Sequence, residues 1–232
     1  MAQISESVGG WLLPVAAILL TTPAFATPLI IVNPSFEDKV LACAPGFGCF
    51  IDGDIPGWSV STIPQTATFK PSTTVGGTFP GGIPNGVNVA AVGNQTGTGA
   101  IWQTLSATLQ PNTAYSLSAA VGRRADFPYS GYSMELNVGQ NILMSSSSAN
   151  PTLGHFAIDS FTFATSANTI GLGQPIVIRL RSLVSGAQVD FDSITLNAVP
   201  IPEPSTSLFM LLGLGLVGAA TNIRNTRRCL SK

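Results

Sequence analysis

Charged residues are scarce in this sequence, since Asp, Glu, Lys and Arg make up 9% of its 232 residues, against about 25% in an average soluble domain. The net charge of −1 offers no excess of positive charge for a nucleic-acid backbone. Long apolar runs are absent from the middle of the chain, which excludes a polytopic membrane protein. Gly (24) and Pro (17) are frequent. The composition therefore favours one turn-rich β domain with apolar segments at its ends.

Signatures of catalysis are also missing. His155 is the single histidine, and its Gly-His-Phe setting is typical of a turn or strand edge. The sequence has no Gly-x-Ser-x-Gly elbow, no His-Glu-x-x-His motif and no phosphate-binding loop with lysine. Asp52 and Asp54 flank Gly53, a spacing typical of a turn, although glycoside hydrolysis also uses two carboxylates. We therefore expect a non-catalytic protein, with an exported glycoside hydrolase as a less favoured alternative.

The N-terminal segment, residues 1–26, has the organisation of a secretory signal peptide. Residues 11–20 are apolar, and Ala24-Phe25-Ala26 follows as a small-x-small cleavage site. The first ten residues contain no Lys or Arg, which departs from the usual pattern. A buried helix is the alternative, but Pro14 and the prolines that follow disfavour it. We expect export through the Sec machinery.

The C-terminal segment, residues 200–232, combines three features in a fixed order. Pro202-Glu203-Pro204 precedes an apolar run at 208–220, and a basic cluster ends the chain: Arg224, Arg227, Arg228 and Lys232. This arrangement resembles the PEP-CTERM sorting signal. The resemblance implies a transmembrane helix with its basic tail in the cytoplasm. It further implies processing by an exosortase and display at the cell surface or release in connection with exopolysaccharide. A buried helix of the domain is the alternative, and the glycines of the run disfavour it.

The intervening segment, residues 27–199, alternates apolar and polar side chains with the period of a β-strand. Such alternation occurs around residues 115–121, 132–138, 161–163 and 176–180, with Gly, Pro and Asn turn signals between them. No convincing helical period occurs. We therefore predict an all-β domain, most simply a jelly-roll β-sandwich.

The final strand changes phase. Val189 and Phe191 are apolar at odd positions, whereas Ile194 and Leu196 are apolar at even positions. Because a slip of one residue reverses the faces of a strand, we predict a β-bulge at Asp192-Ser193 that keeps both pairs inward.

Residues 32–37, 56–58, 101–115 and 189–196 resemble the galactose-binding-like jelly rolls of carbohydrate-binding modules, although Pro34 stands where that family often has glycine. The resemblance implies a structural Ca²⁺ held by Glu37 and Asp192, completed by backbone carbonyls. The alternative is that Glu37 caps a turn and that Asp38 and Asp190 are solvated.

Two of the three cysteines, Cys43 and Cys49, enclose a short Gly/Pro loop. In an exported protein this spacing favours a disulfide. A metal site is the alternative, but no cluster of further Cys or His ligands lies nearby.

Aromatic and polar side chains mark the candidate binding residues. Trp102 shares a strand face with threonines and serine, opposite Ile101 and Leu105, and the loop after residue 122 offers Arg123, Arg124 and Tyr129. Trp58 belongs more naturally to the core, and an Arg–Asp pair could instead order the loop. We expect an exported surface or matrix protein that binds carbohydrate or exopolysaccharide. The alternative is a purely structural surface or biofilm protein without a defined ligand.

Overall fold

The computed structural model describes residues 25–44, 48–61 and 63–202. The expected signal peptide therefore lies almost wholly outside the described residues, as do Glu203, Pro204 and the C-terminal apolar run. Across the three described ranges, no helix has the length and hydropathy that a membrane crossing needs.

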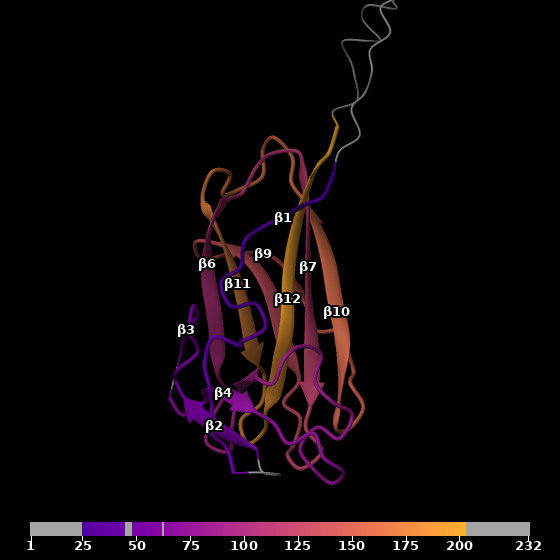
Figure 1. The fold of residues 1–232 in the computed structure, drawn as a ribbon. Coiled ribbons are helices and arrows are strands. Elements are labelled where there is room, and N and C mark those ends of the chain that lie inside the picture. Colours follow the sequence, from indigo (N-terminus) through magenta and orange to yellow (C-terminus); the bar gives the residue numbers. More distant parts are fainter. Residues whose placement is uncertain (1–24, 45–47, 62, 203–232) are drawn as a thin grey trace, which may run out of the picture.

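Two antiparallel sheets face each other in a sandwich (Figure 1). The seven-stranded sheet has the order β10-β7-β12-β5-β4-β2, with β1 paired to β12. Its strands are β1 (Thr27–Pro28), β2 (Cys49–Asp52), β4 (Thr66–Lys70), β5 (Val89–Val92), β7 (Thr113–Arg123), β10 (His155–Ala164) and β12 (Val189–Pro200). The five-stranded sheet has the order β3-β6-β11-β8-β9. Its strands are β3 (Ser59–Val60), β6 (Ala100–Thr108), β8 (Tyr132–Val138), β9 (Asn141–Ser146) and β11 (Pro175–Ser182).

The main core lies between the sheets and contains the apolar residues that alternate along the strands. β7 contributes Tyr115, Leu117, Ala119 and Val121, while β8 and β11 contribute the corresponding residues of the facing sheet. Trp58 belongs to this core, where it lies 5.5 Å from the ring of Phe36. The predicted all-β jelly-roll sandwich is confirmed.

The predicted bulge is present in β12. The register of β12 against β7 shifts between Asp192 and Thr195, and Ser193 adopts a positive φ of 53°. As a result Val189, Phe191, Ile194 and Leu196 all reach the main core, which regular alternation would not allow.

A second, smaller core lies on the outer face of the seven-stranded sheet. Its side chains come from β4, β5 and the segment between them, and its members are Ala67, Phe69, Phe79, Val89 and Ala91. Phe79 is fully buried and packs on Phe156 of β10 at 4.6 Å. Residues 71–88 contain no regular strand, so the period-two pattern gave no signal for Phe79.

The stability of the sandwich depends on core side chains of β12, among them Phe191 near the start of the strand. Phe191 is fully buried and meets the ring of Tyr132 edge-on at 6.0 Å. Phe191→Ala should lower the free energy of unfolding by about 3–5 kcal/mol, because it removes apolar contacts and leaves a cavity. Ile158→Ala is the control, since Ile158 is 65% exposed and its loss should cost less than about 0.5 kcal/mol. Urea unfolding of both variants checks this, and equal losses would contradict it.

Candidate ligand-binding sites

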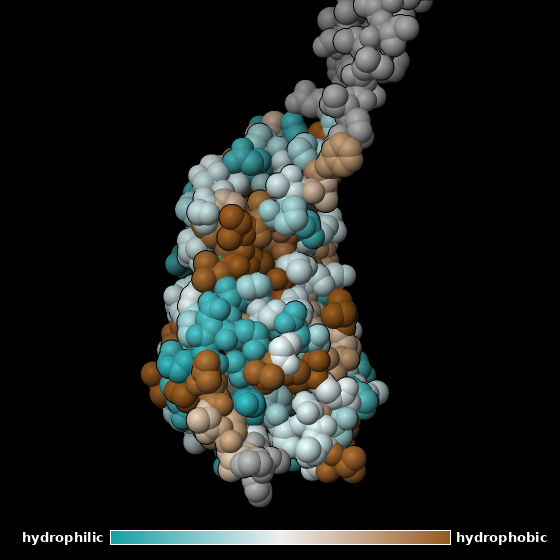
Figure 2. All heavy atoms as spheres, in the orientation of Figure 1, coloured by the Kyte–Doolittle hydropathy of each residue, from teal (hydrophilic) through white to brown (hydrophobic). Residues whose placement is uncertain are grey.

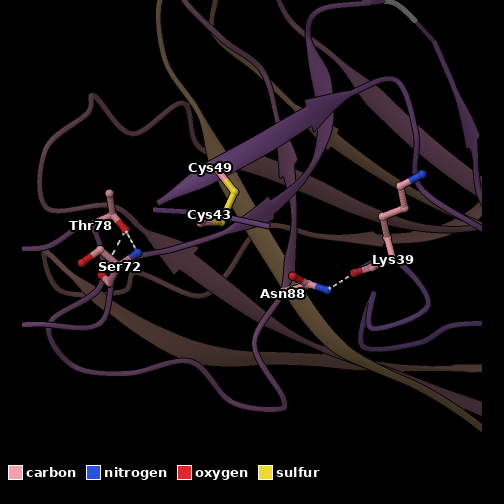
Figure 3. The surroundings of a disulfide bond; sticks show 6 residues. All are labelled: Lys39, Cys43, Cys49, Ser72, Thr78 and Asn88. Atoms are coloured by element: carbon pink, nitrogen blue, oxygen red, sulfur yellow. Dashed lines mark hydrogen bonds between the residues drawn. A yellow bond between two sulfur atoms is a disulfide. The ribbon is translucent and has the colours of Figure 1, made fainter. Parts of the chain in front are cut away.

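The two N-terminal cysteines form a disulfide between Cys43 and Cys49, with their Cα atoms 5.6 Å apart (Figure 3). The bridge ties the start of β2 to the segment that precedes this strand. Asn88, which lies just before β5, donates a hydrogen bond to the carbonyl of Lys39 in the same segment at 2.8 Å. Because both sulfurs are used in the bridge, neither is free as a thiolate metal ligand.

The carboxylates of Glu37 and Asp192 meet at the segment that leads into β5. Glu37 Oε1 accepts hydrogen bonds from the N–H groups of Val87 and Asn88, at 2.9 and 2.8 Å, and Asp192 Oδ2 accepts one from Asn85 at 2.9 Å. Burial raises the pKa of Asp192 to about 7, and the negative charge of Glu37 adds to this effect. Glu37 thus caps backbone N–H groups, as one interpretation of the sequence expected, while also facing a second carboxylate.

These groups are compatible with Ca²⁺, which prefers hard oxygen ligands. In the part of the chain that the structure describes, no three His, Cys, Asp or Glu side chains gather as a metal cluster. A cation here would therefore depend on further oxygens. Asn88 is buried and hydrogen-bonded to Glu37 through its N–H, and its Oδ1 has no hydrogen-bond partner. The carboxylates are ligands of the right chemical type for Ca²⁺, and the unpaired amide oxygen of Asn88 is a further oxygen of that type.

A pocket of about 260 Å³ opens on the outer face of the seven-stranded sheet. Phe50, Phe69, Arg124 and Gln188 are among its lining residues. The guanidinium of Arg124 lies 4.9 Å from the ring of Phe69 and forms two hydrogen bonds with Asp126, at 2.9 and 2.8 Å. These bonds hold the pKa of Asp126 below its usual value. The pocket thus combines aromatic walls with one ordered cation.

Asp190 lies behind this pocket and is fully buried, so the interpretation that it is solvated is wrong. Gln188 Nε2 donates to Asp190 Oδ1 at 2.7 Å, whereas Oδ2 has no partner. Burial raises the pKa of Asp190 to about 7, against the opposing effect of Arg124. Asp190 is buried because it faces Gly122 of β7 and Ala91 of β5. Its place between two core residues of the strand predicts only that it faces away from the main core, so the sequence carried no signal of its burial.

The loop residues that the sequence grouped together are separated by the structure. Arg124 lies in the pocket just described, whereas the guanidinium of Arg123 lies 5.8 Å from the ring of Tyr129. Tyr129 packs against the main core, and its hydroxyl is buried without a partner. This burial raises the pKa of Tyr129 to about 12. Tyr129 is therefore not the free loop platform that the sequence suggested, because its bridge to Gln188 draws the loop onto the sandwich.

Trp102 lies, as its strand face predicted, on the outside of the five-stranded sheet. It lines a groove of about 390 Å³ that crosses β6, β11 and β8. The groove is lined by Trp102, Thr104, Asn137, Gly139, Gln140, Gln174, Pro175, Val177 and Arg179. The guanidinium of Arg179 lies 5.3 Å from the Trp102 ring, a cation–π contact. Arg179 Nε and Asn137 Oδ1 are both buried without hydrogen-bond partners.

Among the other described acidic residues, Asp54 and Asp159 have structural partners. Asp54 forms an ion pair with Lys39, and Asp52 lines the pocket in front of Asp190. Asp159 is buried beside Tyr132. Burial acts to raise the pKa of Asp159, but hydrogen bonds from Ser148, Tyr132 and Ser146 outweigh it and hold that pKa below its usual value. His155 is exposed at the start of β10.

Two protein-family models match this chain. The HpiC1 cyclase model matches residues 27–197, and the PEP-CTERM protein-sorting motif matches residues 200–228. The chain belongs to the HpiC1-like family. The sorting-signal prediction is confirmed, and the motif implies export, membrane anchoring before processing, and processing by an exosortase. No curated protein matches this sequence.

Solved structures agree with this family. The Stig cyclase FisC from Fischerella sp. TAU, in complex with (3Z)-3-(1-methyl-2-pyrrolidinylidene)-3H-indole, is 25% identical with a TM-score of 0.68. The match covers 77% of this chain and 100% of FisC. A cyclase from Fischerella sp. TAU, in complex with 4-(1H-indol-3-yl)butan-2-one, is 25% identical, with a TM-score of 0.65 and coverage of 76% and 99%. A family 16 carbohydrate-binding module is 18% identical with a TM-score of 0.44, over 72% and 97% of the two chains.

Proposed function

We propose that this exported protein binds carbohydrate, as a component of the cell surface or exopolysaccharide, through the groove over Trp102. The observation that carries the proposal is the groove itself. It places an indole ring beside two buried polar atoms that have no partner, Arg179 Nε and Asn137 Oδ1. The sorting motif supports the location of the partner, because it directs the chain out of the cell.

The groove offers what a sugar ring requires. A pyranose has an apolar face, which packs on an aromatic ring, and a rim of hydroxyls, which pair with side-chain amides. Trp102 supplies the ring, and Gln140, Gln174 and Asn137 supply the amides. A buried polar atom without a partner costs free energy, so a ligand that pairs with Asn137 Oδ1 recovers that cost on binding. The volume of about 390 Å³ falls within the usual range of ligand pockets.

Removal of the indole tests the groove. Trp102→Ala should weaken binding of glycans selected on an array by at least about tenfold, because an aromatic anchor in an interface commonly contributes 2 kcal/mol or more. Isothermal titration of the purified protein measures the change. Ile158→Ala, on the opposite sheet, is the matched control for loss of a large apolar side chain and should bind normally. Absence of glycan binding in the wild type would instead support a purely structural surface protein.

A second candidate function comes from the pocket in front of Asp190. A buried carboxyl with one free oxygen behind aromatic walls suits a small aromatic molecule that carries a hydrogen-bond donor. Membership of a cyclase family supports chemistry on such a molecule. A cyclase from Fischerella sp. TAU has been solved with an indole ketone, which makes that compound a suitable probe here.

The probe is 4-(1H-indol-3-yl)butan-2-one. We expect the purified protein to bind it, and Phe50→Ala to weaken binding severalfold, because Phe50 lines the pocket and is 61% exposed. Asp190→Asn should change the affinity as well, while Trp102→Ala on the other sheet should leave it unaltered. Titration calorimetry measures all four proteins. Failure of the wild type to bind would remove this candidate and leave the glycan groove untouched.

We further propose that Glu37 and Asp192 hold a structural Ca²⁺. A ligand that binds only the folded state stabilises it by about 2.7 kcal/mol at a hundred times its Kd. Excess CaCl₂ should therefore raise the Tm by several degrees, and a chelator should reverse the change. Glu37→Gln should abolish the Ca²⁺-dependent increase, whereas Asp38→Asn, at an exposed neighbouring carboxylate, should retain it. A Tm that is unaffected by Ca²⁺ would leave Glu37 as a turn cap alone.

A further inference from the structure

The groove over Trp102 contains one charge. Among its lining residues only Arg179 is ionised, and the others are apolar or neutral polar side chains. A neutral glycan carries no negative charge that could pair with this cation. The charge of Arg179 therefore indicates which sugars the groove selects.

Glu135 is the acidic residue opposite Arg179 in the strand register, but its charge is already paired with Arg181. Glu135 lies opposite Arg179 across the β8–β11 ladder, but it is buried and forms its ion pair with Arg181 at 3.3 Å. Its other hydrogen bonds come from Ser133 and Asn137, both at 3.2 Å. Within the described residues Arg179 has no ion pair. Its positive charge is thus available to a ligand.

The orientation of Arg179 is fixed by Trp102. The guanidinium lies 5.3 Å from the indole centroid, and its Nε is buried without an acceptor. A carboxylate is the natural partner of a guanidinium edge, since its two oxygens match the parallel N–H groups of the fork. A neutral hydroxyl offers only one acceptor oxygen and no charge.

Asn137 adds a second requirement for the ligand, namely a hydrogen-bond donor. Its Nδ2 donates to Glu135 Oε2, which fixes the amide and leaves Oδ1 as an acceptor without a donor. A single ligand that satisfies both sites must carry an acceptor of negative charge for Arg179 and a hydroxyl donor for Asn137. A sugar with a carboxyl group has both.

We infer that the groove selects acidic carbohydrate, namely sugars bearing a carboxylate such as uronic acid residues, with Arg179 as the specificity-determining residue. This inference rests on the proposed carbohydrate binding at the same groove. The carboxylate pairs with the guanidinium, a ring hydroxyl pairs with Asn137, and the sugar packs beside Trp102. Arg179 thereby recognises the carboxylate, whereas Trp102 contributes to the binding of acidic and neutral sugars alike.

The test compares polysaccharide fragments that differ only in the carboxyl group. Oligogalacturonates, alginate oligomers and hyaluronan oligomers are titrated into the purified full chain, each beside its carboxyl-reduced form. We expect at least tenfold tighter binding of one or more of the carboxylated forms. Arg179→Gln should remove that preference while weak binding remains, and Arg179→Lys should restore it only in part, because lysine keeps the charge but loses the fork.

Lys70→Gln is the matched control, since it removes the same charge at the end of β4 on the other sheet and should keep the preference. The melting temperature of each variant establishes that it is folded. Equal binding of carboxylated and reduced fragments would overturn the acidic specificity while leaving carbohydrate binding in place. Failure of every fragment to bind, reduced or not, would overturn both.

Discussion

β12 buries four apolar side chains: Val189 and Phe191 at odd positions, and Ile194 and Leu196 at even positions. A regular strand would turn one of these pairs away from the core, and the bulge at Asp192 and Ser193 lets both pairs point inward. β12 pairs with β7 on one side and with β5 and β1 on the other, so its register fixes the centre of the seven-stranded sheet. Because Phe191 and Ile194 both point inward, Asp190 and Asp192 are left on the opposite face. The bulge that completes the core therefore also leaves two carboxyl groups outside it. Asp190 lies near the pocket, and Asp192 lies near Glu37.

The outer faces of the two sheets differ, and each face carries its own candidate site. The segment 71–88 packs over the seven-stranded sheet through Phe79, which buries aromatic and carboxyl groups and leaves a compact pocket near Asp190. The outer face of the five-stranded sheet around Trp102 instead carries a groove. On the face of the molecule that Figure 2 shows, apolar and polar patches alternate. The pocket near Asp190 and the groove over Trp102 therefore have no lining residue in common.

Sequence periodicity predicted those parts of the structure in which a residue's neighbours along the strand determine its environment. The core positions of β7, β8 and β11, the outward face of Trp102 and the bulge all follow from local alternation. It could not predict the burial of Asp190 or Tyr129. Asp190 is covered because small residues face it across two neighbouring strands, and Tyr129 because a long-range bridge to Gln188 draws its loop inward. Both depend on contacts between segments far apart in the chain, which a single sequence does not specify.

The pairing of β1 with β12 places both ends of the domain at the same end of the sandwich (Figure 1). Asp190 lies ten residues before Pro200 along β12, which corresponds to roughly 30 Å of extended strand. The pocket near Asp190 is therefore separated from the exit toward the sorting motif by most of the length of the domain. Every residue assigned to the pocket, the groove or the carboxylate pair lies between Glu37 and Asp192, so none belongs to the segment that the sorting motif occupies at 200–228. Processing of that segment therefore leaves the residues of all the candidate sites in place, so sorting and the proposed ligand binding depend on separate parts of the chain.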